Sequence, residues 1–294
     1  MEAALYWSTI PNIVFNAVLC FTALTLNCAT IYALRKTPSV PKPLKALLLS
    51  LAVSDLGVGI LVHPLFITRL ALESRLQADL NTSFPTFYRV YMFVTSQFAY
   101  ASFCGVLSLS LDRFLAIHLY LRYQELVTYQ RVVRAVISVW VLSGLIASIW
   151  LIQIQIYIDY VLFAIIGVSC FVVSGVLNSK IYAIVRRHAH QIHSIQGQPT
   201  VQENAPYVTN ASTLRKSTFM TTCIYVLFLV CYLPRFCAVG LHSFYPDLSA
   251  LKAVKQYTST LLLLNSSLNP LIYCWKLRGV RQTIMNMYAA KRTF

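Results

Sequence analysis

One long stretch with almost no charge constrains the fold of this chain more than any other feature. Residues 135–179 contain a single charged side chain, Asp159, in 45 positions. A helix needs about 20 mainly apolar residues to cross a bilayer, so this stretch is too long for one span and long enough for two. Polar side chains at Gln153, Gln155 and Asp159 indicate a tight turn between the two spans. The stretch therefore predicts a protein that crosses a membrane more than once.

Apolar runs of similar length recur from one end of the sequence to the other. They predict a single domain, residues 1–294, with the architecture of an all-α membrane protein: a seven-transmembrane helix bundle. After the last run, Val280, Ile284 and Met287 are interspersed with basic residues, which predicts a short amphipathic eighth helix at residues 278–290 on the membrane surface. The seven spans are expected at residues 10–34, 44–68, 87–119, 133–153, 159–185, 215–241 and 252–277.

The distribution of positive charge predicts the orientation of the chain. It carries 24 Lys and Arg residues and a net charge of +15. Eighteen of the 24 fall on one side of the predicted spans, which by the positive-inside rule is the cytoplasmic side. The N-terminus would then be extracellular and the C-terminus cytoplasmic, in a multi-pass protein of the plasma membrane. The basic side would face anionic membrane lipids. The sequence shows no basic groove with interleaved aromatic residues, so no nucleic-acid partner is expected.

Two connecting segments follow from this orientation. Residues 188–213 are polar and contain one glycine and two prolines, which predicts a flexible cytosolic loop. On the opposite side, Asn81-Thr82-Ser83 lies between the second and third spans and matches the acceptor pattern for N-glycosylation. Asn81 is therefore a candidate glycosylation site.

A few polar side chains inside the spans need a reason to be there. Asp55 lies near the bilayer centre, where a charge costs at least about 2.5 kcal/mol, so it must face the bundle interior. Two interpretations stay open: a hydrogen-bonded packing network around a protonated Asp55, or a hydrated sodium site that collapses on activation. The candidate partners are polar residues of three other spans: Asn27, Ser102, Asn265, Ser266 and Asn269.

Other polar features are weaker when each is taken alone. Asp112-Arg113-Phe114 closes the third span, where a single arginine commonly snorkels to the membrane surface. Pro234 and Pro270 each remove one backbone hydrogen bond and bend their helices. The sequence has no Gly-rich phosphate loop, pair of catalytic carboxylates or nucleophile elbow, so we expect no enzymatic activity.

Together the polar residues form seven short motifs distributed over the spans. They are Asn27; Leu51-Ala52-Val53-Ser54-Asp55; Asp112-Arg113-Phe114; Trp140; Tyr182; Cys231-Tyr232-Leu233-Pro234; and Asn269-Pro270-Leu271-Ile272-Tyr273. In order and spacing they resemble the rhodopsin-like (class A) G-protein-coupled receptors. The segment from Asp112 to Thr128 looks most like adenosine receptors. The very short second outer loop without cysteine looks like melanocortin and cannabinoid receptors, so the chain is placed near that cluster.

The resemblance implies a signalling mechanism and its partners. Asp112 would hold Arg113 in the resting state, and its release would open a cavity for a heterotrimeric G protein. Tyr182 and Tyr273 would swing toward Arg113 and stabilise the open state. A small-molecule or peptide ligand would bind from outside. No cofactor is implied, except for an allosteric sodium ion at Asp55.

The same resemblance implies roles in the sixth and seventh spans. Pro234 would be the pivot for outward movement of the sixth span, with Tyr232 as a packing toggle and Phe228 beneath it. Asn269 and Pro270 would belong to the coupling motif that ends the seventh span.

Departures from the family pattern limit what is implied. Tyr232 replaces the usual tryptophan. Leu214 replaces an acidic residue that often restrains the span-three arginine, which leads to the hypothesis of elevated basal signalling. Tyr88 occupies the position of a cysteine, so the usual disulfide to the second outer loop cannot form.

The ligand class is narrowed mainly by exclusion. Thr95 and Val239 stand where amine and adenosine receptors carry an aspartate and an asparagine, so neither ligand is supported. Arg235 follows the span-six proline and is a candidate anchor for a carboxylate or phosphate, because arginine binds such groups through two hydrogen bonds. The alternative is a structural arginine that pairs with Asp159 or Asp247, or one that snorkels outward. The candidate ligand-binding residues are Thr95, Asp159, Arg235, Val239 and Lys255.

Basic residues at the outer rim offer a further possibility. Arg69, Lys252 and Lys255 could steer an anion inward, although rim charges are more often simply solvated. The main alternative function is a small multi-pass transporter or channel, with Asp55 and Arg235 along a permeation path. The absence of an internal repeat and the seven motifs in register favour the receptor.

Overall fold

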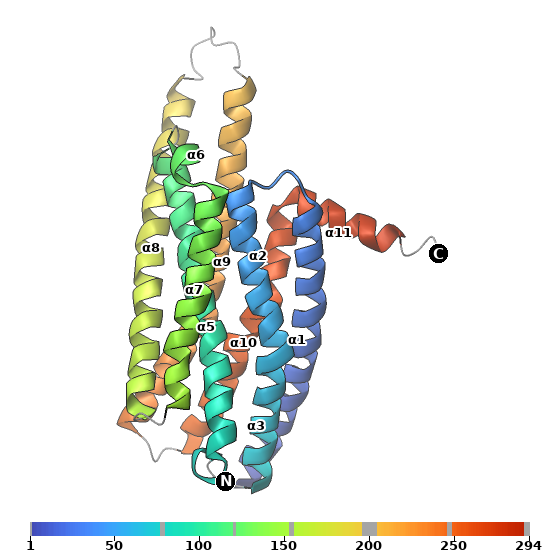
Figure 1. Cartoon of the computed structure of the whole chain (residues 1–294), viewed down its shortest axis with the longest axis vertical. Helices are drawn as coiled ribbons and strands as arrows, with labels where there is room; N and C mark the ends of the chain where they lie inside the picture. Colours follow the sequence, from blue (N-terminus) through green and yellow to red (C-terminus); the bar gives the residue numbers. More distant parts are fainter. Residues whose placement is uncertain are drawn as a thin grey trace.

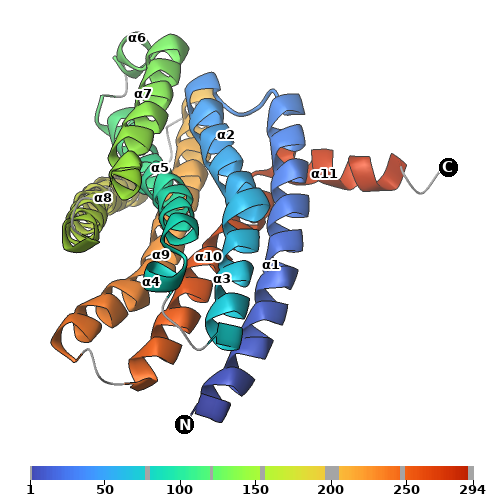
Figure 2. The ribbon, with the colours of Figure 1, turned by 60° about the horizontal axis from the view of Figure 1, so that its bottom comes forward.

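The chain folds into a bundle of long helices. The computed structural model describes residues 2–76, 80–119, 122–152, 156–195, 205–245 and 249–290, and within them it contains helices and turns but no strand. Seven helical segments run side by side in this part of the chain, and α11 (Arg278–Ala290) projects sideways from one end (Figures 1 and 2). The seven are α1 (Glu2–Lys36), α2–η1–α3 (Lys42–Gly57, Val58–Val62, His63–Leu76), α5 (Pro85–His118), α7–η2 (Tyr129–Ala147, Ser148–Leu151), α8 (Ile156–Ile195), α9 (Ala205–Phe244) and α10 (Ser249–Lys276).

Several helices extend beyond the predicted spans. η2 ends at Leu151 and α8 begins at Ile156, on either side of the predicted outer turn. The extent of the predicted loop 188–213 is wrong, because α8 continues to Ile195 and α9 begins at Ala205. A helix that is already formed gains one backbone hydrogen bond for each residue added, so long spans propagate into polar sequence.

Single-turn helices occur in two of the connections. α4 (Leu80–Ser83) lies between α3 and α5, and α6 (Tyr123–Leu126) lies between α5 and α7. Asn81 belongs to α4, but its side chain is outside the described part of the structure, so its glycosylation stays a prediction.

The seventh helix differs from the others in polarity. Six of the described helical segments, from Thr9–Lys36 to Thr218–Leu241, are long and apolar enough to cross a membrane by length and composition. α10 is not among them, although it has 28 residues. Its polar side chains at Thr260, Asn265 and Asn269 are buried in the bundle. Polar residues are tolerated within a membrane when they face the protein interior, so the low hydropathy of α10 reflects its position in the bundle.

Hydrogen bonds made by polar side chains join α10 to α1 along their length. Asn16 donates from Nδ2 to Thr260 Oγ1 (2.9 Å), and the hydroxyls of Thr22 and Ser267 are 3.0 Å apart. Closer to the other end, Asn27 Nδ2 donates to the Ser266 carbonyl oxygen (2.9 Å). Helices in lipid gain little from the hydrophobic effect when they associate, so packing and such polar contacts hold the pair together.

The second span contains a π-helical turn. η1 begins three residues after Asp55, and the Cys20 thiol of α1 donates to the carbonyl oxygen of Gly59 within it (3.2 Å). A π turn takes more residues per turn than an α-helix, so it changes the face that α3 presents relative to α2. Such turns are frequent at functional sites.

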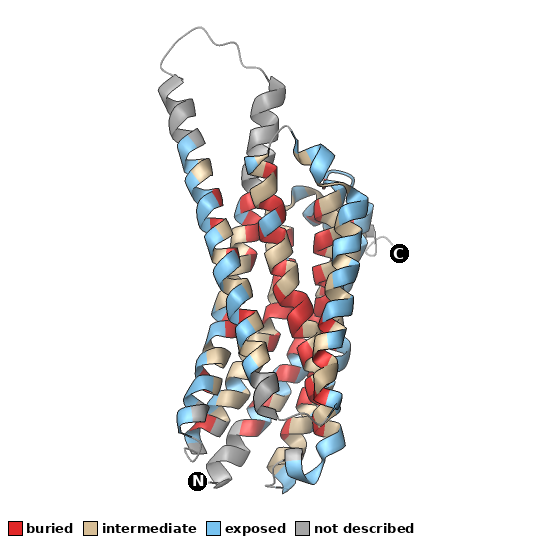
Figure 3. Ribbon diagram, turned by 60° about the vertical axis from the view of Figure 1, so that its left-hand side comes forward, coloured by how far each residue is buried: buried red, intermediate tan, exposed pale blue. Residues whose placement is uncertain are grey.

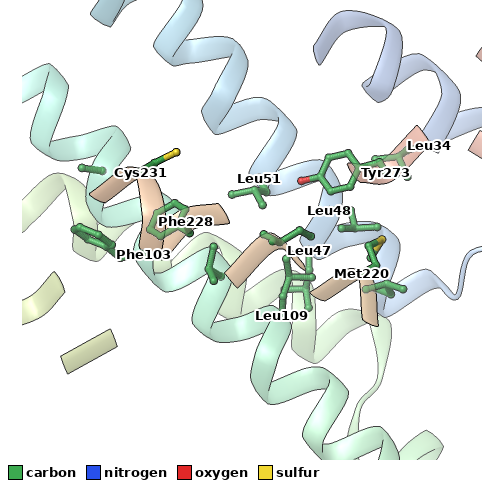
Figure 4. Packing of buried hydrophobic residues seen from close by; sticks show 14 of the residues in the cluster. Leu34, Leu47, Leu48, Leu51, Phe103, Leu109, Met220, Phe228, Cys231 and Tyr273 are labelled. Carbon is green, nitrogen blue, oxygen red and sulfur yellow. The ribbon is translucent and has the colours of Figure 1, made fainter. Parts of the chain in front are cut away.

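Burial divides the helices into an inner and an outer side. Buried residues line the interior and exposed ones face outward along each described helix (Figure 3). Large apolar side chains such as Phe21, Val172 and Val230 are exposed, as expected for a surface in contact with lipid. The apolar core includes Leu51, Leu109 and other side chains from α1, α2, α5, α9 and α10 (Figure 4).

Candidate functional site

The Asp112–Arg113 motif forms a closed group of three side chains together with Tyr123. Asp112 and Arg113, near the end of α5, are both buried. Arg113 donates from Nε to Asp112 Oδ2 (2.9 Å), and its terminal nitrogen reaches the same oxygen. The Tyr123 hydroxyl of α6 donates to the other carboxylate oxygen, Asp112 Oδ1, at 2.7 Å. Both oxygens of Asp112 are therefore bonded. This is not a lone arginine that snorkels to the surface.

Tyr123 was not among the site residues expected from the sequence. Its hydroxyl is half-buried against Asp112, and burial together with the nearby carboxylate raises its pKa well above the ordinary value. The phenol therefore keeps its proton and remains a donor over the accessible pH range. The signal that could have found it is its place at the start of a helical turn between the third and fourth spans.

The other expected coupling residues occupy different environments. Tyr273 is fully buried, and its hydroxyl has no hydrogen-bond partner among the described residues. Tyr182 is on the outside of α8, with 68% of its surface exposed, so it is not part of the group around Arg113 in this structure. Phe114 stacks on His118 one turn further along α5, with ring centroids 5.3 Å apart.

Asp55 lies at the centre of a polar region in the middle of the bundle. It is fully buried and accepts a hydrogen bond at Oδ2 from Asn269 Nδ2 (2.9 Å). Its second oxygen, Oδ1, has no partner among the described residues, and neither does Oδ1 of Asn265 or Asn269. Ser102 is turned elsewhere, since its hydroxyl is 3.1 Å from that of Ser54. Of the predicted sodium ligands, Asp55 of α2 and Asn269 of α10 are therefore in contact. Ser102 of α5 bonds to Ser54 instead.

The unpaired oxygens suit a sodium ion chemically. A carboxylate and amide oxygens are hard ligands, which alkali and alkaline-earth cations prefer, and a buried charge is stable when paired or bound to a cation. The neighbouring cavity of about 10 Å³, lined by Ser266 and Thr95, is close to the least space that holds one water molecule, and Asp55, Asn265 and Asn269 do not line it. The unpaired oxygens of Asp55, Asn265 and Asn269 therefore fit a sodium ion by their chemistry.

Aromatic rings connect this region to the sixth span. Tyr232 stacks on Phe228 with ring centroids 4.2 Å apart and an interplanar angle of 20°. Phe103 of α5 lies 5.0 Å from Tyr232 and 5.6 Å from Phe228. Such pairs add about 0.5–1.5 kcal/mol each beyond the area they bury. Figure 4 shows Phe103 and Phe228 close together within the core, and Pro234 lies further along the same helix as Phe228, α9.

The expected ligand-binding residues lie on four helices, α5, α8, α9 and α10. Arg235 is half-buried and donates from a terminal nitrogen to the Lys255 carbonyl oxygen (3.1 Å), which ties α9 to α10. Thr95 lines the same small cavity as Ser266, and its hydroxyl has no partner among the described residues. Val239 is half-buried one turn beyond Arg235. The side chains of Asp159 and Asp247, the predicted ion-pair partners of Arg235, lie outside the described part.

Arg69 corrects the expectation of a solvated rim charge. Its guanidinium lies over the rings of Tyr88 and Tyr91, 5.8 and 5.2 Å from their centroids, and Nε donates to Glu73 (2.8 Å). Tyr88 in turn packs edge-on against Trp150 of η2. These contacts join α3, α5 and η2 at the end where the usual disulfide cannot form. Hydropathy could not reveal them, because only the packed helices bring the rings under the guanidinium.

Comparison with known proteins agrees with this arrangement. Residues 26–273 match the family model described as 7 transmembrane receptor (rhodopsin family). The chain is similar to adenosine receptor A3 of Ovis aries, with 22% identity over 97% of this chain and 91% of that protein. It is also similar to the alpha-1A adrenergic receptor of Rattus norvegicus, with 27% identity over 64% of this chain and 49% of that protein. The multi-pass helical bundle and the family match together confirm the resemblance: the chain belongs to the rhodopsin family of seven-transmembrane receptors.

Proposed function

We propose that this receptor resides in the plasma membrane and converts binding of an extracellular ligand into activation of a cytosolic heterotrimeric G protein. The buried group of Asp112, Arg113 and Tyr123 carries the proposal, because it sequesters the arginine that a G protein would contact. In this orientation the N-terminus is extracellular, and α11 lies along the inner membrane surface. The positive-inside distribution of Lys and Arg supports it.

Release of Arg113 is the step that couples the two sides. In the closed arrangement its guanidinium is bound by Asp112, and only 3% of the residue is exposed. A partner that inserts at this end gains contacts only when α9 moves away from α5. A ligand that binds the open arrangement more tightly shifts the population toward it, by no more than its differential affinity.

Residues in the middle of the bundle would transmit that shift. Tyr232 and Phe228 pack against Phe103, so outward movement of α9 about Pro234 must separate or rearrange these rings. On α10, Asn269 is bonded to Asp55 and Tyr273 is four residues further along. A sodium ion at Asp55 would supply positive charge to the buried carboxylate and favour the closed state.

The ligand that best suits the outer cavity is an anion. Arg235 is half-buried, and the Lys255 carbonyl oxygen holds its guanidinium toward α10. A carboxylate or phosphate that reaches this guanidinium could form a bidentate pair with it. In this proposal Asp159, Val239 and Lys255 border the same outer region.

Nucleotide exchange tests the proposed function. The purified receptor in lipid nanodiscs is mixed with each of several purified G-protein heterotrimers, and exchange of GDP for a labelled GTP analogue is measured. Exchange above that of empty nanodiscs is expected for at least one heterotrimer, and replacement of Arg113 by Ala should remove it. If no heterotrimer responds but proteoliposomes carry ions or solutes, the transporter or channel alternative holds instead.

A further inference from the structure

A groove between the starts of α2 and α7 has the lining of an anion site. It has a volume of about 330 Å³ and is lined by Lys42, Lys45, Ala46, Leu49 and Tyr129. We call these five residues the α2–α7 groove. None of them belongs to the group around Asp112 or to the cavity beside Asp55.

The positive charge of the groove is not neutralised by the protein. Lys45 uses one of its protons to donate to the Thr37 carbonyl oxygen (2.6 Å), which fixes the direction of its ammonium group. Within the part of the chain that the structure describes, the ion pairs are Arg69 with Glu73 and Arg113 with Asp112, so neither groove lysine has an acidic partner there. Lys42 opens α2, and its N-cap residue Pro41 makes no side-chain capping bond. The first turn therefore adds the N–H groups of Lys42 and Leu44, since Pro43 has none, and the positive end of the helix dipole.

The position of the groove favours a lipid, rather than a soluble anion, as its ligand. The apolar segments that can cross the membrane begin at Lys42 in α2 and at Tyr129 in α7, so both residues lie where head groups meet the hydrocarbon. Ala46 and Leu49 are one and two turns deeper and give the groove an apolar floor. Cations and a tyrosine at the boundary, above aliphatic side chains, match the order of a phospholipid from phosphate to acyl chain.

The two helices that form the groove are joined below it. Trp140 of α7 donates from Nε1 to the hydroxyl of Ser50 in α2 (3.0 Å). Tyr129 is 52% exposed and Lys42 is exposed, so the rim of the groove is open. At its base the bond between Trp140 and Ser50 holds the two helices together. A lipid phosphate between Lys42 and Lys45 would contact both helices at once and oppose their separation.

We infer that the α2–α7 groove binds the phosphate head group of an anionic phospholipid in the leaflet that faces the basic side of the receptor. The inference rests on the proposed function for its orientation, in which that leaflet is the cytosolic one. Its test needs no G protein, so the two can fail independently.

Thermal unfolding in nanodiscs measures the interaction. The receptor is placed in phosphatidylcholine alone, or with added phosphatidylserine or phosphatidylinositol 4,5-bisphosphate, and Tm is recorded for each. Anionic lipid should raise Tm, and the lipid concentration for half of that rise should increase roughly tenfold or more in Lys42→Gln/Lys45→Gln. The single variant Lys42→Gln, at an exposed position, should show part of the same loss without risk to folding.

Two controls distinguish lipid binding in the α2–α7 groove from a general effect of positive charge on the protein surface. Arg278→Gln/Arg281→Gln removes the same charge from exposed positions of α11 at the same end of the bundle and should keep the lipid effect. Ala46→Phe fills the floor while both lysines remain, and should weaken it. Equal loss in the two charge-removing pairs would overturn the inference. So would an equal rise in Tm from soluble inositol trisphosphate, which carries the head-group phosphates without acyl chains.

Discussion

Tyr123 and Asp112 are joined by a hydrogen bond of 2.7 Å that links the short α6 helix to the end of α5. The Tyr123 hydroxyl donates to Asp112 Oδ1, and Arg113 donates to Asp112 Oδ2. Both oxygens of the carboxylate are therefore held in place. The restraint on the span-three arginine therefore includes a residue outside the spans. Leu214, which replaces an acidic residue in α9, has its side chain outside the described part of the structure.

Replacement of Tyr123 by Phe should raise basal signalling. Hydrogen bonds to charged groups contribute about 1.5–3 kcal/mol, and a bond present only in the closed state stabilises that state by its full value. A loss of about 1.4 kcal/mol shifts the closed-to-open ratio by a factor of about ten, so ligand-free nucleotide exchange should rise by up to that factor. Tyr32→Phe, on the outside of α1, is the matched control. An unchanged basal rate in Tyr123→Phe would show that the bond does not restrain activation.

Replacement of Arg235 by Leu should abolish responses to anionic compounds. The measurement is signalling by cells challenged with a library of carboxylate- and phosphate-bearing molecules, with surface expression determined in parallel. Arg75→Gln is the control, because it removes one positive charge from an exposed position of α3 outside the candidate ligand-binding residues. If Arg235→Leu reaches the surface and responds with unchanged potency, the arginine serves only to join α9 to α10.

Replacement of Asp55 by Asn should remove any dependence of stability on sodium. A site occupied at ten times its Kd stabilises the folded receptor by about 1.4 kcal/mol. Tm of the purified receptor should therefore be several degrees higher in NaCl than in choline chloride, and Asp55→Asn should eliminate the difference while Asn269 keeps an oxygen to donate to. Ser54→Ala, which alters the neighbouring contacts with Ser102 and the Phe98 carbonyl oxygen, should retain it. A sodium effect that survives Asp55→Asn places the ion elsewhere.

Replacement of Arg69 by Ala should destabilise the outer end of the bundle. It removes an ion pair worth about 0.3–0.5 kcal/mol and two cation–π contacts worth about 0.5–1 kcal/mol each. We expect a loss of about 1–2 kcal/mol in unfolding free energy, seen as a lower Tm in detergent. Arg75→Ala, at an exposed position of the same helix, should change stability by less than about 0.5 kcal/mol. Equal effects of the two variants would mean that the ring contacts contribute nothing.

The amino-acid sequence alone indicated the helices and the family. Apolar runs of spanning length identify membrane helices because unpaired backbone groups are not tolerated in lipid, and this physical demand does not depend on how the helices pack. The spacing of Asp55, Arg113, Pro234 and Pro270 along the chain identified the receptor family. Like the apolar runs, this spacing can be read from the sequence without a structure. It also predicted that Asp55 and Asn269 would meet.

Only the packed bundle decided which polar groups pair with one another. Ser102 bonds to Ser54 rather than to Asp55, and Arg69 is held by two tyrosine rings and Glu73. Such pairings depend on how each helix is rotated about its axis, and the π turn η1 changes that rotation in the second span. Spacing in the sequence determines how far along its helix a side chain lies. Which residue it contacts depends on how the neighbouring helices pack around it.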